Sequence, residues 1–450
     1  MTASLYTHLV SGALFPLHER LKGHTSVAKR RALEQSQWWP TERILAAQQQ
    51  KLAAFMARIA RDVPYYAKVF RDAGLAPDAI RTPADLARLP FLTKADIRAH
   101  GEDLRAAGAA PLRRLNTGGS SGEPLVFFVG PERISHDVAA KWRATRWWGV
   151  DIGDPEIVLW GSPIEVNAQD RVRALRDAVL RTRLLPAFDL SPDSIDGFLD
   201  TIASVRPPML FGYPSAFALM ARQAEASGRD LSGLGIRVAF VTSERLYDDQ
   251  RQVIERVFGC PVANGYGGRD AGFIAHQCPA GGMHVMAEDI VLEVIDPDGR
   301  PLPPGHSGEL VVTHLATGDY PFVRYRTGDV GVLGTAPCPC GRGLPLLERI
   351  EGRTTDFIVA QDGTPMHGLA LIYVVRDLPH VESFKIVQES RERVEVFIVP
   401  GPGYSHDTAR PIQEGFRARL GQGVEVQVTV VEDIPREKSG KFRYVVSHAQ

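Results

Sequence analysis

The sequence TGGSSGEP occupies residues Thr117–Pro124 and lies between two short apolar runs, Leu112–Leu115 and Leu125–Val129. We expect the two runs to be strands that this loop joins. From Arg114 to about residue 350, runs rich in β-branched residues, such as Val238–Val241, alternate with amphipathic stretches such as Asp248–Phe258. Strands that alternate with helices in this way are typical of an α/β fold with a substantial parallel sheet.

Local patterns predict further elements on both sides of this core. A run rich in Gln, Ala and Leu over Thr41–Asp62 predicts one long helix, and the proline in Val63–Tyr66 ends it. Apolar and polar residues alternate with period two in Ile290–Ile295 and Gly308–Thr313. These two runs predict antiparallel strands, with a turn at Asp296–Gly299.

The chain changes character after Gly352. Two strand candidates, Val394–Val399 and Val424–Val431, flank a helix candidate at Thr408–Leu420. A chain of 450 residues is also too long for one ordinary core. We therefore expect a large, multi-sheet α/β N-terminal domain over residues 1–352, mainly helical over residues 1–110, and a small mobile α+β C-terminal domain over residues 353–450.

Composition excludes several classes of function. The chain has 52 basic and 53 acidic residues without a long block of one charge, so we expect no nucleic acid surface. Its longest apolar runs, such as Leu9–Leu17, are too short to cross a bilayer, and its N-terminus lacks the pattern of a signal peptide. We expect a cytoplasmic protein whose partners are small molecules. The sequence leaves open whether the chain forms a homodimer.

The loop Thr117–Pro124 suits phosphate oxygens. Its three glycines let the backbone come close to a ligand, and Thr117, Ser120 and Ser121 add hydroxyl donors. It is not a Walker loop, because Glu123 and Pro124 stand where that motif ends in Lys and Ser or Thr. A plain connector remains the alternative interpretation of this loop taken alone.

Four more motifs follow the loop in a fixed order: YGGRD (266–270), YRTGD (325–329), EGR (351–353) and PREKSGKFR (435–443). Tyr266 offers a ring for stacking on a base, and Asp270 offers carboxylate oxygens for magnesium. Asp329 is suited to ribose hydroxyls, and Arg353 to ribose or phosphate. Each residue has an ordinary structural alternative, but together the motifs predict a site that holds ATP and activates a carboxylate.

Four cysteines in 450 residues are sparse for a secreted scaffold, and reducing cytosol would keep them as thiols. Cys278, His284, Cys338 and Cys340 make a set that suits tetrahedral zinc, although the spacing of Cys338 and Cys340 is tighter than usual. The alternative is that these are small buried thiols and a loop histidine.

With these motifs the chain resembles the adenylate-forming superfamily of acyl-CoA synthetases, and within it the phenylacetate-CoA ligase family, near its capsular polysaccharide biosynthesis-type branch. The resemblance covers nearly the whole chain. It also includes Phe211–Ser215, Thr242–Leu246 and the sequence GRTTD at residues 352–356.

The resemblance implies a role for each matched residue. Thr117–Gly122 would wrap the ATP phosphates, Ser121 and Asp270 would support magnesium, and Lys441 would be the catalytic lysine. Zinc would bind the Cys/His set named above, as in some relatives. The implied nucleotide contacts are Thr117, Gly118, Gly119, Ser120, Ser121, Gly122, Ser243, Glu244, Arg245, Tyr266, Gly267, Asp329, Arg353 and Lys441, and the implied acid pocket contains Tyr213, Phe240, Gly267 and Phe273.

The chemistry of these roles is electrostatic. A carboxylate that attacks the α-phosphate of ATP must overcome the repulsion between two anions, so cations must be placed there. A lysine with an ordinary pKa of about 10.4 is protonated at neutral pH and acts as a movable point charge. No general base is needed, because the acid is already ionised.

Two departures from the family pattern keep alternatives open. Asp270 stands where the family usually has glutamate, which is one methylene longer. The stretch Phe357–Leu371 lacks the glycine and glutamate pattern that shapes the tunnel for CoA. The acceptor is therefore CoA or an amine, and a nucleotide-binding scaffold on a degenerate ligase fold is a further alternative. Tyr213, Phe240 and Phe273 favour an aromatic or rigid apolar acid, although they also suit an ordinary core.

Overall fold

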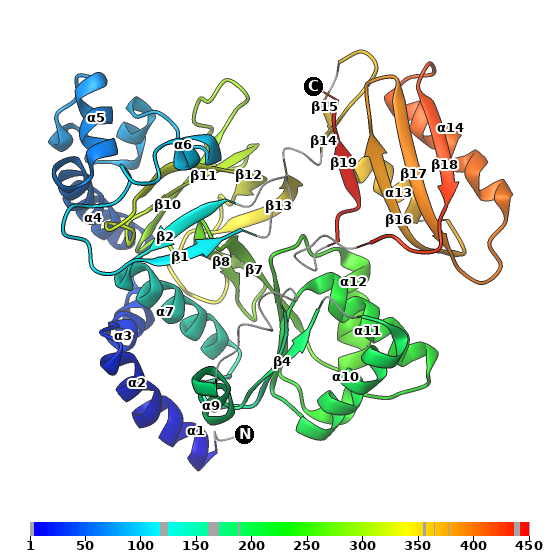
Figure 1. Cartoon of the computed structure of the whole chain (residues 1–450), viewed down its shortest axis with the longest axis horizontal. Coiled ribbons are helices and arrows are strands. Elements are labelled where there is room, and N and C mark those ends of the chain that lie inside the picture. The colour runs from blue at the N-terminus through cyan, green and yellow to red at the C-terminus, as the bar shows by residue number, and fades with distance from the viewer. Residues whose placement is uncertain are drawn as a thin grey trace. The chain divides into compact units, whose positions relative to one another are not determined.

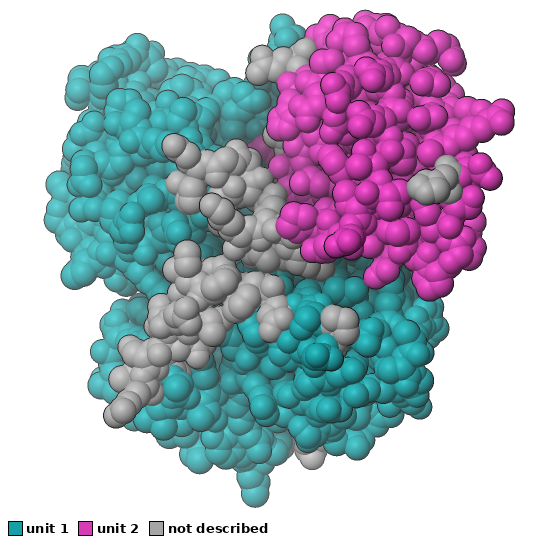
Figure 2. All heavy atoms as spheres, turned by 45° about the vertical axis from the view of Figure 1, so that its right-hand side comes forward, with its two compact units in different colours: residues 1–327, 331–350, 438–440 teal, residues 328–330, 351–437, 441–450 magenta. Residues whose placement is uncertain are grey.

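The computed structural model describes residues 4–117, 125–160, 171–187, 190–353, 357–363, 365–376, 378–435 and 442–449. The chain forms two compact units, coloured teal and magenta in Figure 2. The first unit comprises mainly residues 1–327 and 331–350. The second unit comprises residues 328–330, 351–437 and 441–450.

The N-terminal part of the first unit is helical, as predicted (Figure 1). The helix expected at Thr41–Asp62 is confirmed as α4, whose buried stripe includes Ile44, Leu52 and Ile59. It ends at Val63 because Pro64 begins the next helix. The helical elements here are α1 (Leu5–Leu9), η1 (Val10–Leu14), α2 (Phe15–Leu21), α3 (Ser26–Ser36), α4 (Thr41–Asp62), α5 (Pro64–Asp72), η2 (Pro77–Ala79), η3 (Pro83–Arg88) and α6 (Lys94–Ala99).

A sheet of seven strands forms the α/β core, in the order β4-β3-β5-β6-β7-β8-β9. The first five strands in this order are parallel, and β8 and β9 continue the sheet antiparallel. The strands are β3 (Glu156–Trp160), β4 (Thr182–Pro186), β5 (Met209–Gly212), β6 (Val238–Thr242), β7 (Val262–Gly268), β8 (Gly272–Gln277) and β9 (Met283–Val285). The helices between them are α9 (Arg171–Leu180), α10 (Pro192–Val205), α11 (Pro214–Ala226), η4 (Ser232–Leu234) and α12 (Asp248–Phe258).

Helices cover both faces of this sheet. Every residue of β5 and β6 is buried, as parallel strands between two helical layers require. On one face, Phe211 and Phe240 pack with Ala144 of α7 (Pro131–Trp147). On the other face, Leu210 and Val241 pack against α10, α11 and α12, which Figure 1 shows in green. The alternation of side chains along each strand thus builds two cores from one apolar run.

Smaller sheets complete the first unit. The two strands expected around the glycine-rich loop are β1 (Arg113–Asn116) and β2 (Val126–Val129), and they pair antiparallel. The strands expected at residues 290–313 are confirmed as β10 (Ile290–Ile295) and β11 (Ser307–His314), also antiparallel. They form a sheet with β12 (Phe322–Leu333) and β13 (Leu347–Arg353) in the order β10-β11-β12-β13.

The second unit is α+β, as predicted. Its main sheet has the order β18-β17-β16-β19, in which β16 and β17 are antiparallel and the outer pairs are parallel. Phe384, Ile398 and Phe416 are among its buried side chains. The elements are β14 (Phe357–Val359), β15 (Pro365–His367), α13 (Leu369–Arg376), β16 (Val381–Gln388), β17 (Arg393–Pro400), η6 (His406–Thr408), α14 (Ala409–Leu420), β18 (Glu425–Val430) and β19 (Val445–Ser447). Among the described residues of both units, no helix has the length and apolar content that crossing a membrane requires.

Candidate active site

Most predicted site residues of the first unit lie where the parallel strands end. Tyr213 follows β5, Ser243–Arg245 follow β6, Tyr266 and Gly267 lie near the end of β7, and Asp270 lies in the turn beyond it. The carboxyl ends of parallel strands share one edge of a sheet, and open α/β sheets bind ligands at that edge. The topology therefore gathers residues that are far apart in the sequence.

Asp270 is held by a tyrosine from another sheet. The phenol of Tyr325 in β12 donates a hydrogen bond of 2.6 Å to Oδ2 of Asp270, and the backbone N–H of Ala271 donates one of 3.0 Å to Oδ1. Tyr325 is fully buried. A charge-assisted hydrogen bond of this length fixes the direction of the carboxylate. Two of the predicted motifs, YGGRD and YRTGD, thus meet at one carboxylate.

A second contact joins the same two motifs. The Tyr266 hydroxyl lies 3.4 Å from Oγ1 of Thr327, which in turn donates a hydrogen bond of 2.8 Å to the Leu310 carbonyl. Tyr266 is only 8% exposed, so most of its ring is already covered by protein. Asp329 follows Thr327 by two residues in β12.

The segment after β6 has a constrained backbone. Ser243 has a φ of 70°, in the left-handed region that non-glycine residues rarely adopt. The next residue, Glu244, accepts a hydrogen bond of 3.2 Å at Oε2 from the backbone N–H of Ser215, in the first turn of α11. A carboxylate at a helix N-terminus is stabilised by the helix dipole. The hydrogen bond between Ser215 and Glu244 links the segments that follow β5 and β6. The guanidinium of Arg245 lies 5.2 Å from the ring centre of Tyr247.

Several predicted residues fall outside what the structure describes. Thr117 closes the base of the glycine-rich loop, because its N–H donates to the Leu125 carbonyl at 2.9 Å and its Oγ1 accepts from the Leu125 N–H at 3.0 Å. Arg353 is the last residue of β13, without a described side chain. The predicted residues outside the described ranges are Gly118, Gly119, Ser120, Ser121, Gly122 and Lys441.

The three aromatic residues predicted for the acid pocket have different surroundings. Tyr213 is 3% exposed and stacks on Trp160, with ring centres 4.6 Å apart. Phe240 is fully buried within the core beside α7. Phe273 is partly exposed and stacks on His276 at 5.3 Å. Of the three, Phe273 has the accessibility that direct contact with a substrate needs.

The structure brings the cysteine and histidine set together. One ligand atom from each of Cys278, His284, Cys338 and Cys340 lies within 4.8 Å of the others. Nε2 of His284 lies 3.2 Å from Sγ of Cys340, while its Nδ1 lies 3.3 Å from the Leu344 carbonyl. A backbone carbonyl that accepts from one ring nitrogen leaves the other free for a metal. Burial lowers the pKa of His284 to about 4, so the imidazole is neutral.

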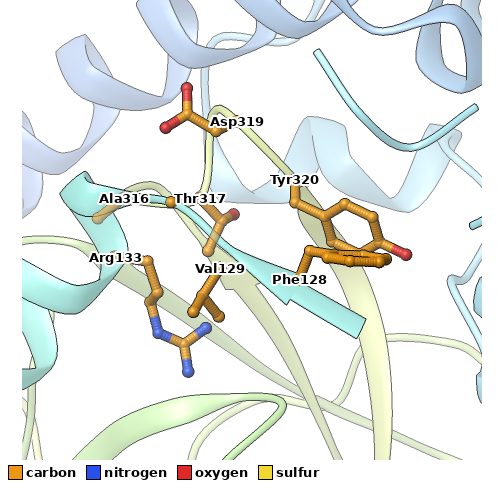
Figure 3. A pocket seen from close by; sticks show the side chains of 8 residues that line it. Phe128, Val129, Arg133, Ala316, Thr317, Asp319 and Tyr320 are labelled. Atoms are coloured by element: carbon orange, nitrogen blue, oxygen red, sulfur yellow. The ribbon is translucent and has the colours of Figure 1, made fainter. Parts of the chain in front are cut away.

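Two contributors to the site were missed by sequence reasoning. Tyr325 stands in a motif that was recognised, but its contact with Asp270 depends on a meeting of two sheets. Arg133 in α7 lies in no motif, yet it contacts the backbone of the YGGRD turn. Figure 3 shows Arg133 at a small recess beside Thr317, with its guanidinium extending away from Phe128 and Tyr320. None of the predicted site residues that the structure describes lines this recess, and we assign it no ligand.

Comparisons with known proteins agree with the fold. A family model described as AMP-binding enzyme matches residues 181–317, and one described as CapK C-terminal domain matches residues 358–448. Protein CapK of Staphylococcus aureus is 23% identical over 89% of this chain and 88% of its own length. Phenylacetate-coenzyme A ligase of Thermus thermophilus is 24% identical over 90% of this chain and 97% of its own length.

Solved structures show the same fold. A crystal structure of 2-hydroxyisobutyryl-CoA ligase in the postadenylation state has a TM-score of 0.74 and 20% identity, covering 92% of this chain and 91% of that one. The mixed α/β architecture with several sheets and a C-terminal domain is therefore confirmed. By these matches the chain is similar to the adenylate-forming ligases, and among them to phenylacetate-CoA ligases and to CapK.

Proposed function

We propose that this chain uses ATP to convert a carboxylic acid to an acyl-adenylate, with release of pyrophosphate, and then transfers the acyl group to CoA. The observation that carries the proposal is the contact of Asp270 with Tyr325, which joins two nucleotide motifs at the edge of the parallel sheet. The phenylacetate-CoA ligase relatives, each similar over much of this chain, support the same reaction class.

The residues present fit a magnesium ion. Asp270 offers hard oxygen ligands of the kind that magnesium prefers, and each oxygen keeps a lone pair beyond the one used by Tyr325 or Ala271. Magnesium offsets the phosphate charge when it is bound. We assign Asp270 and Ser121 to it, and Lys441 to the α-phosphate and the acid oxygen.

The residues of the chain then act by position and charge. Tyr325 directs the Asp270 carboxylate, Thr117 closes the loop that we assign to the phosphates, and Tyr266 places its ring where we assign the adenine. The Lys441 ammonium would reduce the repulsion between the attacking carboxylate and the α-phosphate. The bond from carboxylate to phosphorus forms as the bond to pyrophosphate breaks.

A panel of acids tests the first half of the reaction. Aryl, arylacetic and fatty acids are each incubated with ATP, magnesium and labelled pyrophosphate, and exchange of label into ATP is measured. We expect exchange with aromatic or rigid apolar acids, because the partly exposed ring of Phe273 would present a flat apolar surface to them. Exchange with no acid of any class would contradict the proposal and favour the scaffold alternative.

The acceptor is a separate question. The match of residues 358–448 to the CapK C-terminal domain allows an amine acceptor as the second candidate. An acid that supports exchange is therefore offered CoA or an amine, and the product is identified by mass spectrometry. A thioester supports the main proposal, whereas an amide supports the alternative.

The variant Lys441→Ala separates an enzyme from a nucleotide-binding scaffold. We expect this variant to bind ATP as the wild-type chain does, and to lose exchange by at least about 100-fold, because the cation at the reacting groups is gone. Isothermal titration calorimetry measures the first property, and the exchange assay measures the second. Unchanged turnover would show that Lys441 has no catalytic role.

We also propose that Cys278, His284, Cys338 and Cys340 bind a structural zinc ion. The four ligand atoms lie within 4.8 Å of one another, and the chemistry of the set, three thiols and one imidazole, suits a closed tetrahedral site. Gly282 supports the close packing, because a Cβ there would lie 2.5 Å from Sγ of Cys338. The ion would fasten the β8–β9 hairpin to the loop that contains Cys338.

A further inference from the structure

The side chain of Arg133 is almost fully buried and all three of its nitrogens are used. Nη1 donates to the carbonyl of Asp270 at 3.1 Å, and Nη2 donates to the carbonyl of Arg269 at 3.3 Å. Nε lies 3.0 Å and 2.9 Å from the two carboxylate oxygens of Asp137, one turn further along α7. Arg133 is 1% exposed. A planar guanidinium with fixed donors is the group best suited to hold two carbonyls at once.

From these contacts we infer that Arg133 is a positioning residue for adenylation, which sets the backbone of the Arg269–Asp270 turn so that the short Asp270 carboxylate reaches the metal. This inference rests on the proposed function and deepens it. The family usually has a glutamate at this position, and an aspartate has one methylene less to adjust its reach. The placement of the backbone therefore decides where the carboxylate lies.

The turn between β7 and β8 packs directly on the guanidinium of Arg133. Gly272 has a φ of 89°, and a Cβ at this position would lie 2.8 Å from Nη2 of Arg133 and 3.0 Å from the His314 ring. The pairing of β7 and β8 also shifts register between Tyr266 and Gly267. The irregular turn thus has its carbonyls turned toward α7, where Arg133 is their described donor.

Arg133 is itself held in place by a chain of polar and charged side chains, of which His136 and Asp289 are buried. Asp137 lies 3.5 Å from Nδ1 of His136, whose Nε2 lies 3.7 Å from Asp289, and Asp289 pairs with Lys51 at 2.9 Å. Burial raises the pKa of Asp137, but Arg133 and His136 outweigh it, so the pKa lies below its usual value. The carboxylate partner of Arg133 is therefore ionised at neutral pH. The network anchors α7, which follows the glycine-rich loop, to α4.

The test compares Arg133→Lys with Arg143→Lys in the full-length chain. Arg133→Lys keeps the charge beside Asp137 but loses the fork that holds two carbonyls. Arg143 is a matched control, because it is also buried on α7 but pairs with Glu288 and lies outside the YGGRD turn. Binding of Mn²⁺ in the presence of a non-hydrolysable ATP analogue is followed by electron paramagnetic resonance, and exchange is measured against Mg²⁺ concentration.

We expect Arg133→Lys to weaken Mn²⁺ binding and to raise the half-saturating Mg²⁺ concentration on the order of 10-fold, as for other residues that orient a metal ligand. Arg143→Lys should lower the melting temperature without shifting either value. Adding Asp270→Glu to Arg133→Lys should recover part of the lost metal affinity, because a longer side chain tolerates a displaced backbone. A residue that only stabilises the fold would give no such recovery.

The outcomes separate this inference from the proposed function. If folded Arg133→Lys binds Mn²⁺ and responds to Mg²⁺ as the wild-type chain does, the positioning role is wrong. If the wild-type chain binds the metal and nucleotide but activates no acid, the proposed function fails, while the comparison of Mn²⁺ binding still decides the role of Arg133. Should Arg133→Lys fail to fold, Asp137→Asn gives the same readout, because it removes the partner that holds Arg133.

Discussion

At the scale of single residues, the phenol of Tyr325 is the group closest to the proposed chemistry among those that sequence reasoning did not assign. Its hydrogen bond to Asp270 is 2.6 Å long and partly buried. We predict that Tyr325→Phe lowers the rate of ATP/pyrophosphate exchange by about 10- to 100-fold, since hydrogen bonds to charged groups are worth roughly 1.5–3 kcal/mol. Exchange kinetics with a responsive acid measure the effect.

The matched control is Tyr320→Phe. Tyr320 is also a buried tyrosine, and its hydroxyl has no hydrogen-bond partner among the described residues. Removing that hydroxyl should leave the exchange rate within about twofold of wild type, because no hydrogen bond is lost. Equal effects of the two substitutions would mean that the contact with Asp270 does not matter for the reaction.

Buried histidines make the stability of the protein depend on pH. Burial lowers the pKa of His276 to about 3 and that of His314 well below its usual value. Below about pH 6.5 the unfolded chain binds protons at these residues and the folded chain does not, so stability falls as pH falls. Lowered carboxyl pKa values, as at Asp137 and Asp289, act in the same direction but only below about pH 4–5.

We therefore predict that the free energy of unfolding drops between pH 7.5 and pH 5.5 by about 1.4 kcal/mol for each such histidine. Urea unfolding at the two pH values measures the drop. His276→Leu should reduce it by about the contribution of one histidine, whatever the substitution does to stability at pH 7.5. A drop that is the same in the variant and the wild type would show that His276 is not buried in its neutral form.

Residue types and their order predict the members of the candidate site, but not their contacts. Tyr266, Asp270 and Asp329 are recognisable because their motifs are local in sequence. The contacts of Asp270 with Tyr325 and Arg133 join segments 55 and 137 residues apart. Such contacts depend on how the sheets and α7 pack, and no local pattern carries that information.

At the scale of elements, predictions succeeded where a pattern repeats along one helix or strand. The predicted bounds of α4 and α12 agree with the structure at both ends. The C-terminal ends were predictable because a proline, Pro64, lies just beyond α4 and a glycine, Gly259, follows α12. The antiparallel return of β8 beside β7 was not predicted. Its irregular register depends on Gly272 and on packing against α7, which are tertiary effects.

The zinc proposal is tested at this scale, because the ion would join the β8–β9 hairpin to the loop that contains Cys338. We predict that the purified protein contains about one zinc ion per chain and that Cys338→Ser loses it, together with several degrees of melting temperature. Elemental analysis by mass spectrometry and differential scanning fluorimetry measure the two effects.

Cys260 provides the control for this experiment. It is buried like Cys278 and Cys338 but lies outside the cluster. Cys260→Ala should therefore keep its zinc, even if packing changes lower its melting temperature. Protein that carries no zinc when purified without chelators, and that gains no stability when zinc is added, would refute the proposed site.

At the scale of the whole molecule, the division into two units predicts that the C-terminal part folds alone. Its four-stranded sheet buries side chains from both helices and all four strands, including Phe384, Ile398, Phe416, Val426 and Val445. About a hundred residues are enough to bury such a core. We expect a fragment of residues 351–450 to unfold cooperatively in urea and to give well-dispersed amide resonances.

The complementary fragment, residues 1–350, tests whether ATP binding and adenylation depend on different units, as the proposed function requires. It keeps Tyr266, Asp270 and the glycine-rich loop but lacks Lys441, so it should bind ATP and fail to adenylate an acid. Its ATP affinity should be lower than that of full-length Lys441→Ala, because the fragment lacks Arg353 as well as Lys441. A fragment that adenylates at the wild-type rate would show that the C-terminal unit takes no part in the first half of the reaction.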